Sequence, residues 1–252
     1  MMSSMSPNDT FTALQEGEIT LRGEFMWGSN YTYLAQLEHA GEILIAVYKP
    51  TKGVRPLWDF PSPSLARREV AAYLISEALH WELVPPSAYR KDAPLGPGSV
   101  QLYIDHDPEY HYFNFTHEDR QRLRPTVVFD LLANNADRKG SHILVDTNHH
   151  MWLIDHGICF HVDEKLRTVI WDYAGEEIPA QLLADVKRLR DKLLLLNKQP
   201  AEFESSDLVR ELGKYLNKEE IAAIIRRADR LLENGCYPNP DLSRRQYPWP
   251  PV

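Results

Sequence analysis

The chain has 252 residues, of which 43% are hydrophobic, and a formal net charge of -8. This length supplies apolar material for one large domain or two packed lobes, and the negative charge argues against nucleic acid as a partner. Two cysteines are too few for a disulfide framework. The N-terminus does not resemble a signal peptide, and no window approaches the roughly 20 apolar residues that a membrane span needs. We therefore expect a cytoplasmic protein without integral membrane association.

The N-terminal part of the chain is rich in β-branched and aromatic residues. This strand-like pattern covers residues 11–47, with glycines between its apolar runs. We expect three antiparallel strands, at residues 18–22, 31–37 and 42–48. The prolines between residues 50 and 64 predict a loop, and Ser64 is a suitable N-cap for the element that follows.

An amphipathic helix is predicted for residues 65–81, because apolar residues recur there every three or four positions. The pair Pro85-Pro86 ends this helix. Two extended pieces follow within residues 84–104, the second of them at residues 99–104. Strands and one helix together predict a first lobe at residues 11–104.

From residue 105 onward the pattern becomes mostly helical. A helical stretch covers residues 118–134, and Pro125 is expected to start a fresh helix within it. We then expect a small hairpin at residues 142–145 and 151–154, and helices at residues 179–196, 206–215 and 218–234. A helical second lobe is thus predicted at residues 105–236. The Pro-rich tail, residues 237–252, is either an ordered strap or disordered.

Charged residues lie where a site for phosphoryl transfer would need them. Such a site requires cations near the phosphates, carboxylates that hold a metal ion and an acidic group that orients the acceptor. Lys49 ends an apolar strand, and Glu69 on the next helix is placed to pair with it, although each could be an ordinary surface charge. Asp137 lies in a polar loop between a helix and a strand, where catalytic groups concentrate, but it could also be a plain turn residue.

Asp155 directly follows the apolar run Trp152-Leu153-Ile154. A carboxylate at the end of a buried strand needs a partner, and Mg²⁺ prefers hard oxygen ligands. The position therefore favours a metal ligand, with a structural Asp that caps the next turn as the alternative.

The order of these motifs along the chain resembles the phosphatidylinositol 3/4-kinase-like branch of the protein-kinase fold. The motifs are Lys49, Glu69, the Asp137-Arg138 loop and the turn at residues 154–157. A bacterial family related to these kinases shares signatures at residues 47–50, 55–61, 68–73, 135–138 and 153–157. The likeness covers roughly residues 18–196. It implies an α+β, two-lobed fold with a small N-terminal lobe of antiparallel sheet and one helix, and a mostly helical C-terminal lobe.

The resemblance also implies a role for each matching residue. Lys49 becomes the phosphate-binding lysine and Glu69 its partner, while Asp137 becomes the catalytic base beside Arg138. The nucleotide-binding residues implied are Gly28, Ser29 and Asn30 in a loop over the phosphates, Gln101, Leu102, Tyr103 and Ile104 in an adenine hinge, and Ile154. Asp155 is the implied principal metal ligand, and His142 stands where related enzymes place a second metal-binding side chain, an Asn.

The predicted activity is transfer of the γ-phosphate of ATP to a hydroxyl of a protein or small molecule, with Mg²⁺ or Mn²⁺ as the metal. A pseudokinase that binds nucleotide without turnover is one alternative, motivated by His142 and by the lack of an ordinary Gly-rich loop. An adenylyl transferase on the same scaffold is another. Lipid-kinase activity is not expected, because 252 residues leave no room for the membrane-binding domains that lipid kinases commonly carry.

Overall fold

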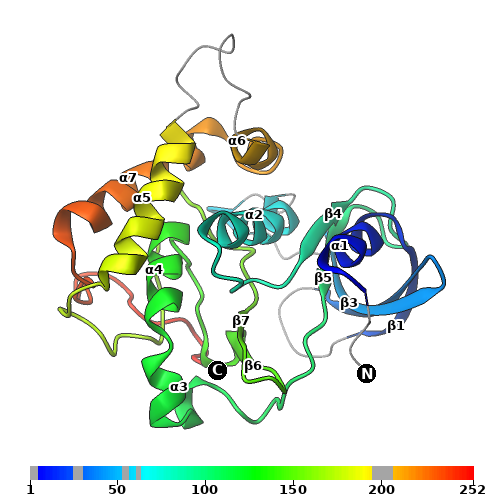
Figure 1. Cartoon of the computed structure of the whole chain (residues 1–252), viewed down its shortest axis with the longest axis horizontal. Coiled ribbons are helices and arrows are strands. Elements are labelled where there is room, and N and C mark those ends of the chain that lie inside the picture. Colours follow the sequence, from blue (N-terminus) through cyan, green and yellow to red (C-terminus); the bar gives the residue numbers. More distant parts are fainter. Residues whose placement is uncertain (1–4, 25–30, 53–56, 61–63, 195–206) are drawn as a thin grey trace.

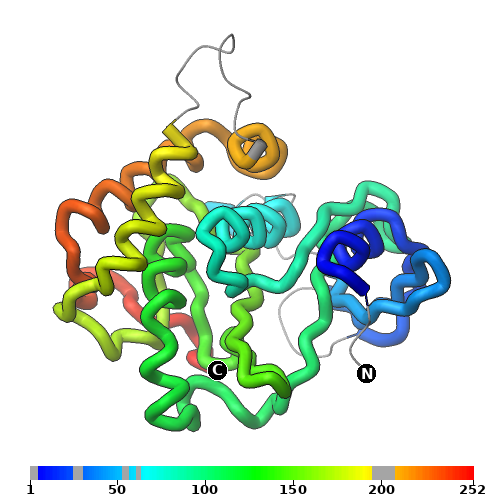
Figure 2. Tube along the Cα trace, viewed as in Figure 1, coloured from blue at the N-terminus to red at the C-terminus, as the bar shows by residue number. Residues whose placement is uncertain are grey.

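The fold is described from a computed structural model that covers residues 5–24, 31–52, 57–60, 64–194 and 207–252. An antiparallel sheet with two helices forms the N-terminal region, and helices with one small hairpin form the C-terminal region (Figure 1). This is the α+β class that the sequence predicts. The tube in Figure 2 shows the two regions lying side by side.

The N-terminal sheet has five antiparallel strands in the order β1-β2-β3-β5-β4. They are β1 (Glu18–Glu24), β2 (Tyr33–His39), β3 (Glu42–Pro50), β4 (Ser87–Arg90) and β5 (Gly98–Leu102). On β3, Leu44, Ala46 and Tyr48 are buried in the core of the sheet. Because side chains alternate along a strand, Val47 and Lys49 lie on the opposite face. The predicted strand at residues 99–104 ends earlier, at Leu102.

The prediction of a strand-like start at residue 11 is wrong, because helix α1 (Pro7–Glu16) occupies this stretch. Ser6 caps the helix by accepting a hydrogen bond from the Asp9 N–H at 3.2 Å, and Pro7 lies in the first turn. Ala13 and Leu14 are buried against the sheet. The cap and the buried face outweigh the strand preference of the aromatic and β-branched residues.

Helix α2 (Leu65–Leu79) lies between the sheet and the C-terminal helices (Figure 1). It ends because His80 takes a left-handed conformation, with φ of 58°, two residues before the predicted end. Ser64 precedes the helix, but its side chain does not cap it as expected. The Ser64 Oγ instead accepts a hydrogen bond from Arg68 Nε at 3.1 Å.

The C-terminal region contains the helices α3 (His117–Gln121), α4 (Arg124–Ala133), α5 (Ala180–Leu194), α6 (Asp207–Leu212) and α7 (Lys218–Asn234). Pro125 lies in the first turn of α4, as predicted. The predicted hairpin is present as β6 (Ile143–Val145) and β7 (Met151–Leu153). His142, expected at the start of the first hairpin strand, instead ends the 3-10 turn Gly140–His142. Two loops that carry predicted site residues thus flank this hairpin.

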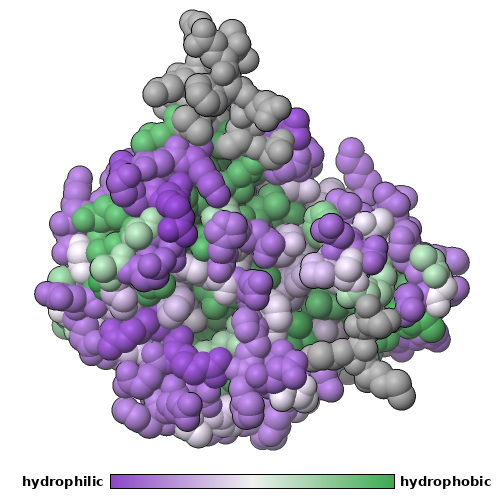
Figure 3. Space-filling model, viewed as in Figure 1, coloured by the Kyte–Doolittle hydropathy of each residue, from purple (hydrophilic) through white to green (hydrophobic). Residues whose placement is uncertain are grey.

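Residues 237–252 form an ordered strap without regular secondary structure, in which Tyr237 is 2% exposed. In the part of the chain that the structure describes, none of the helices combines the length and hydrophobicity that crossing a membrane requires. Figure 3 shows polar side chains spread over the viewed face, with smaller groups of hydrophobic ones between them.

Candidate functional site

The centre of the site is an ion cluster of one lysine and two carboxylates. Lys49 Nζ lies 2.7 Å from Glu69 Oε1 and 2.5 Å from Asp155 Oδ1, which confirms the expected Lys49–Glu69 pair. Burial alone would lower the pKa of the Lys49 ammonium, but the two carboxylates outweigh it and raise that pKa. The charge of Lys49 holds the pKa of Asp155 well below its usual range. The cluster keeps one net negative charge, which suits a cation.

The second oxygen of Glu69 fixes the turn that carries Asp155. Glu69 Oε2 accepts a hydrogen bond from the His156 N–H at 2.9 Å. Asp155 itself has a φ of 64°, a left-handed conformation that costs free energy in a residue with a side chain and that clusters at functional sites. Glu69 therefore joins three elements, α2, β3 and the turn after β7.

Asp137 lies in the loop between α4 and β6, at residues 134–142, which we name the Asp137 loop. Its N–H donates to Asn135 Oδ1 at 2.9 Å, and its side chain is 28% exposed. Burial raises the pKa of the Asp137 carboxyl to about 6, and the negative charge of Asp155 acts in the same direction. A general base works best when its pKa lies near the working pH, so this environment suits proton abstraction.

Lys139, two residues after Asp137, places its Nζ 3.7 Å from Asp137 Oδ2. Lys139 was not among the predicted site residues. The available signal was its spacing, since side chains two positions apart share one face of an extended loop.

His142 connects Asp137 to Asp155. Its Nδ1 lies 3.0 Å from the Asp137 carbonyl oxygen, which can only accept, so Nδ1 carries a proton. Burial lowers the pKa of the imidazole to about 4, which makes the ring neutral at pH 7 and leaves a lone pair on Nε2. That lone pair faces Asp155 Oδ2 at 3.2 Å. Two acceptors at this separation fit a shared cation between them.

His142 and Asp155 together offer only two side chains as metal ligands. Among the described residues there is no group of three or more His, Cys, Asp or Glu side chains that could hold a metal ion. Mg²⁺ in phosphate-transfer sites is typically held by one or two protein ligands, with phosphate oxygens and waters completing its shell. Asp155 and His142 fit such an open site.

Arg138 is fully buried, and all five of its guanidinium N–H groups have acceptors within the protein. These acceptors are the two carboxylate oxygens of Asp130, the carbonyl oxygens of His142 and Ile154, and Nε2 of His156. No N–H group is left for a substrate. Arg138, predicted as catalytic, is thus placed to position the Asp137 loop against the Asp155 turn.

His156 follows Asp155 and is also fully buried. Its Nε2 accepts from Arg138 at 2.8 Å, so the proton of this neutral ring is on Nδ1. Burial lowers the pKa of His156, and the charge of Arg138 lowers it further. The ring packs against Phe129, with 5.6 Å between the centroids, and so helps to anchor the turn that carries Asp155.

A cavity of about 200 Å³ opens beside the ion cluster. It is lined by Thr32, Val47, Lys49, Gln101, Leu102, Tyr103, Ile104, His106, Leu144, Ile154 and Asp155. The whole predicted hinge and Ile154 are among these residues. Thr32, Val47, His106 and Leu144 were not predicted, although the alternation along β3 places Val47 on the face of Lys49. Gly28, Ser29 and Asn30 lie outside the described residues.

The hinge is held by backbone hydrogen bonds. Leu102 N–H donates to the Pro86 carbonyl at 2.9 Å, and Tyr103 N–H donates to the Ile45 carbonyl at 3.0 Å. The side chain of Gln101 is buried and donates to Ser87 Oγ at 2.8 Å, so it does not enter the cavity as a free donor.

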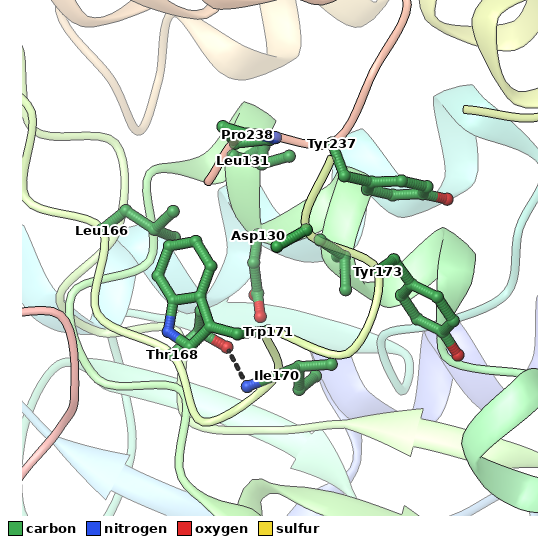
Figure 4. Close-up of a pocket in the computed structure, with 11 residues that line it drawn as sticks. Asp130, Leu131, Leu166, Thr168, Ile170, Trp171, Tyr173, Tyr237 and Pro238 are labelled. Carbon is green, nitrogen blue, oxygen red and sulfur yellow. Dashed lines mark hydrogen bonds between the residues drawn. The ribbon is translucent and has the colours of Figure 1, made fainter. Parts of the chain in front are cut away.

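A second cavity, shown in Figure 4, is lined in part by Asp130 and measures only about 10 Å³. It is enclosed by α4, by residues 166–174 and by the Tyr237-Pro238 start of the strap. This volume holds about one water molecule and no larger ligand. Of these two cavities, the one beside Lys49 is the larger.

No family model matches the chain. The chain is 37% identical over 278 residues to protein Rv2133c of Mycobacterium tuberculosis (strain ATCC 25618 / H37Rv), and the alignment covers 96% of this chain and 95% of the relative. The chain belongs to the Rv2133c family. The alignment with this relative covers both regions of the fold.

The solved structures that are similar to this member of the Rv2133c family include the three that follow. The structure of hydra Fam20 with sugar has a TM-score of 0.50 and 14% identity, covering 89% of this chain and 87% of that one. The golgi casein kinase has a TM-score of 0.49 at 12% identity, and the match covers 93% of this chain and 78% of that one. The Helicobacter pylori proinflammatory kinase CtkA has a TM-score of 0.46 at 13% identity, and the match covers 86% of this chain and 97% of that one. The Fam20 likeness shows that this chain shares the fold of that structure.

Proposed function

We propose that the protein is an ATP-dependent phosphotransferase that moves the γ-phosphate of ATP to a hydroxyl of a protein or small molecule. The observation that carries the proposal is the Lys49 cluster, with Glu69 at 2.7 Å and Asp155 at 2.5 Å, at the edge of a cavity of about 200 Å³. In this proposal a nucleotide-binding lobe, residues 11–104, and a catalytic lobe, residues 105–236, form one kinase-like domain with the tail at residues 237–252.

The adenine would lie in the cavity against the hinge, Gln101 to Ile104. Among the described residues, the Ile104 N–H has no backbone acceptor and can therefore donate to the base. Lys49, held by Glu69, would engage the phosphates. This arrangement places the triphosphate beside Asp155.

Asp155 and His142 would hold Mg²⁺ or Mn²⁺, which neutralises the phosphate charge that develops during transfer. Asp137 would orient the acceptor hydroxyl and take its proton. The hydroxyl oxygen then bonds to the γ-phosphorus as the bond to the β–γ bridging oxygen breaks, and ADP leaves. Lys139, beside Asp137, supplies a positive charge near the transferred group, while Arg138 only holds the loop.

We further propose that the protein belongs to the phosphatidylinositol 3/4-kinase-like branch of this fold, on the strength of the motif order from Lys49 to Gly157. A reducing compartment such as the cytoplasm is consistent with its two free cysteines, Cys159 and Cys236.

The experiment that tests the proposal uses purified full-length protein with ATP and Mg²⁺ or Mn²⁺. Label from γ-labelled ATP is expected on the protein or in released phosphate, and removal of the metal by a chelator should abolish it. Label retained only from α-labelled ATP would instead show adenylyl transfer. If nucleotide and metal raise the melting temperature without any turnover, the protein is a pseudokinase, the alternative that His142 at a metal position favours.

The imidazole of His142 predicts a metal preference. A nitrogen ligand suits Mn²⁺ better than Mg²⁺, so turnover by the native protein should be faster with Mn²⁺ at equal concentration. The variant His142→Asn should shift the ratio of the two rates toward Mg²⁺, measured at saturating ATP. The control is His149→Asn, which changes an exposed histidine whose φ of 60° suits Asn. An unchanged rate ratio in His142→Asn would show that His142 is no metal ligand.

A further inference from the structure

The strap at residues 237–252 follows a defined path over the C-terminal region. At its start, Tyr237 N–H donates to the Glu176 carbonyl at 2.9 Å, and its own carbonyl accepts from Gly175 N–H at 3.0 Å. Its ring packs on Tyr173, with 5.5 Å between the centroids. Figure 4 shows Tyr237 and Pro238 beside residues of α4 and of the chain near Tyr173. The red trace in Figure 1 then runs from α7 toward the β6–β7 hairpin.

In its middle, the strap reaches the Asp137 loop through one intervening segment, residues 167–169. Arg138 N–H donates to the Arg167 carbonyl at 2.9 Å, and the Arg138 carbonyl accepts from Val169 N–H at 3.1 Å. In an extended chain the backbone groups of successive residues point to opposite sides. The Thr168 N–H accordingly points away from the loop and donates to the Gln246 carbonyl at 3.0 Å. Loop, segment and strap thus lie side by side.

Near its end, the strap contacts the Asp137 loop directly. Gly140 N–H donates to the Pro251 carbonyl at 2.8 Å. A Cβ atom at Gly140 would lie 2.9 Å from the ring of Phe113 and 3.6 Å from the Pro251 oxygen, so no side chain fits there without displacement. The backbone three residues after Asp137 is therefore packed between Phe113 and the strap.

We infer that the strap is a positioning element of the catalytic unit: the carbonyl groups of Gln246 and Pro251 hold the Asp137 loop on both sides of Lys139, the first through residues 167–169, and so fix the Asp137 carboxylate for the acceptor. The inference rests on the proposed function. The strap contacts the backbone at Gly140 and Thr168, whereas the Asp137 side chain remains 28% exposed. A strap that supports the loop from behind and leaves the base accessible is expected to promote turnover rather than to inhibit it.

Two adjacent positions of the strap offer a matched test in the full-length protein. Pro248 is buried and Trp249 is 78% exposed, so a charge introduced at Pro248 should displace the strap while the same charge at Trp249 should not. Both Pro248→Glu and Trp249→Glu are compared with the native protein by amide hydrogen exchange, melting temperature, and kcat and KM for ATP.

In Pro248→Glu, exchange at Gly140 and Thr168 should become faster, because their N–H groups lose their acceptors. A displacement of about 1 Å at a catalytic group costs on the order of 100-fold, so kcat should fall by up to that factor while the KM for ATP stays unchanged. Trp249→Glu should match the native protein in every measurement. A purely structural role would lower the melting temperature without this split between kcat and KM.

Unchanged exchange at Gly140 and Thr168 would overturn the inference, as would faster exchange with unchanged kcat. A higher kcat would show an inhibitory strap and would overturn it too. If the native protein does not turn over ATP, the proposed function fails by itself, and the exchange measurement alone then supports or overturns the ordering of the loop. Should Pro248→Glu not fold, Pro248→Ala, which removes only the buried ring, is measured in the same way.

Discussion

Replacement of Asp137 by Asn is expected to lower kcat by about 10²–10⁴-fold, the usual contribution of a general base. The amide is similar in size to the carboxylate but cannot take the proton of the acceptor hydroxyl. Nucleotide binding should be retained, because Asp137 is not among the residues that line the cavity beside Lys49. Steady-state phosphate transfer and a thermal shift with ATP and metal measure the two effects separately.

The control for this variant is Asp163→Asn, which changes a carboxylate that is 78% exposed, and it should leave kcat unchanged. The raised pKa of Asp137, about 6, also predicts a pH dependence. The base is active when deprotonated, so kcat/KM in the native protein should fall as the pH drops below about 6. A rate within tenfold of native in Asp137→Asn, or no loss of rate at low pH, would assign the base role to another group.

Replacement of Arg138 by Met is expected to lower the free energy of unfolding by roughly 3–5 kcal/mol, as the loss of one partner of a buried ion pair does. Asp130, only 1% exposed, would keep a charge whose two oxygens accept from Arg138 at 2.9 to 3.2 Å. The carbonyl oxygens of His142 and Ile154 would lose their donor as well. Urea unfolding followed by circular dichroism measures the change.

A second variant separates the unpaired charge from the lost packing. In Asp130→Asn combined with Arg138→Met, the buried charge is absent, so the double variant should be more stable than Arg138→Met alone. If Arg138→Met has the same urea midpoint of unfolding as the native protein, the guanidinium contributes no net stabilisation. The assigned positioning role then fails.

Most of the secondary structure was predictable because it is encoded locally. The alternation of apolar residues in β3 and the three- to four-residue spacing in α2 predict both elements, and the motif order located Lys49 and Asp155. Helix α1 was missed because its aromatic and β-branched residues favour a strand, whereas burial of Ala13 and Leu14 on the sheet favours a helix. Local preference and packing disagree there, and packing determines the result.

The roles of buried polar groups were less predictable. Nothing in the sequence around Arg138 shows that its five N–H groups are all occupied within the protein, which turns an expected catalytic residue into a positioning residue. Likewise, the protonation of His142 follows only from its contact with the Asp137 carbonyl and from its burial. Both depend on neighbours that the fold supplies.

The sequence by itself determined the α+β class, the order of most elements and the identity of the charged residues, because local periodicity and residue chemistry carry that information. Only the tertiary structure decided that Glu69, twenty positions from Lys49, and Asp155, 106 positions from it, meet at one ammonium group. It also decided that the tail is a strap whose Pro251 carbonyl binds the Asp137 loop at Gly140. Such contacts join distant segments whose local patterns are independent, so only the packing of the whole chain brings them together.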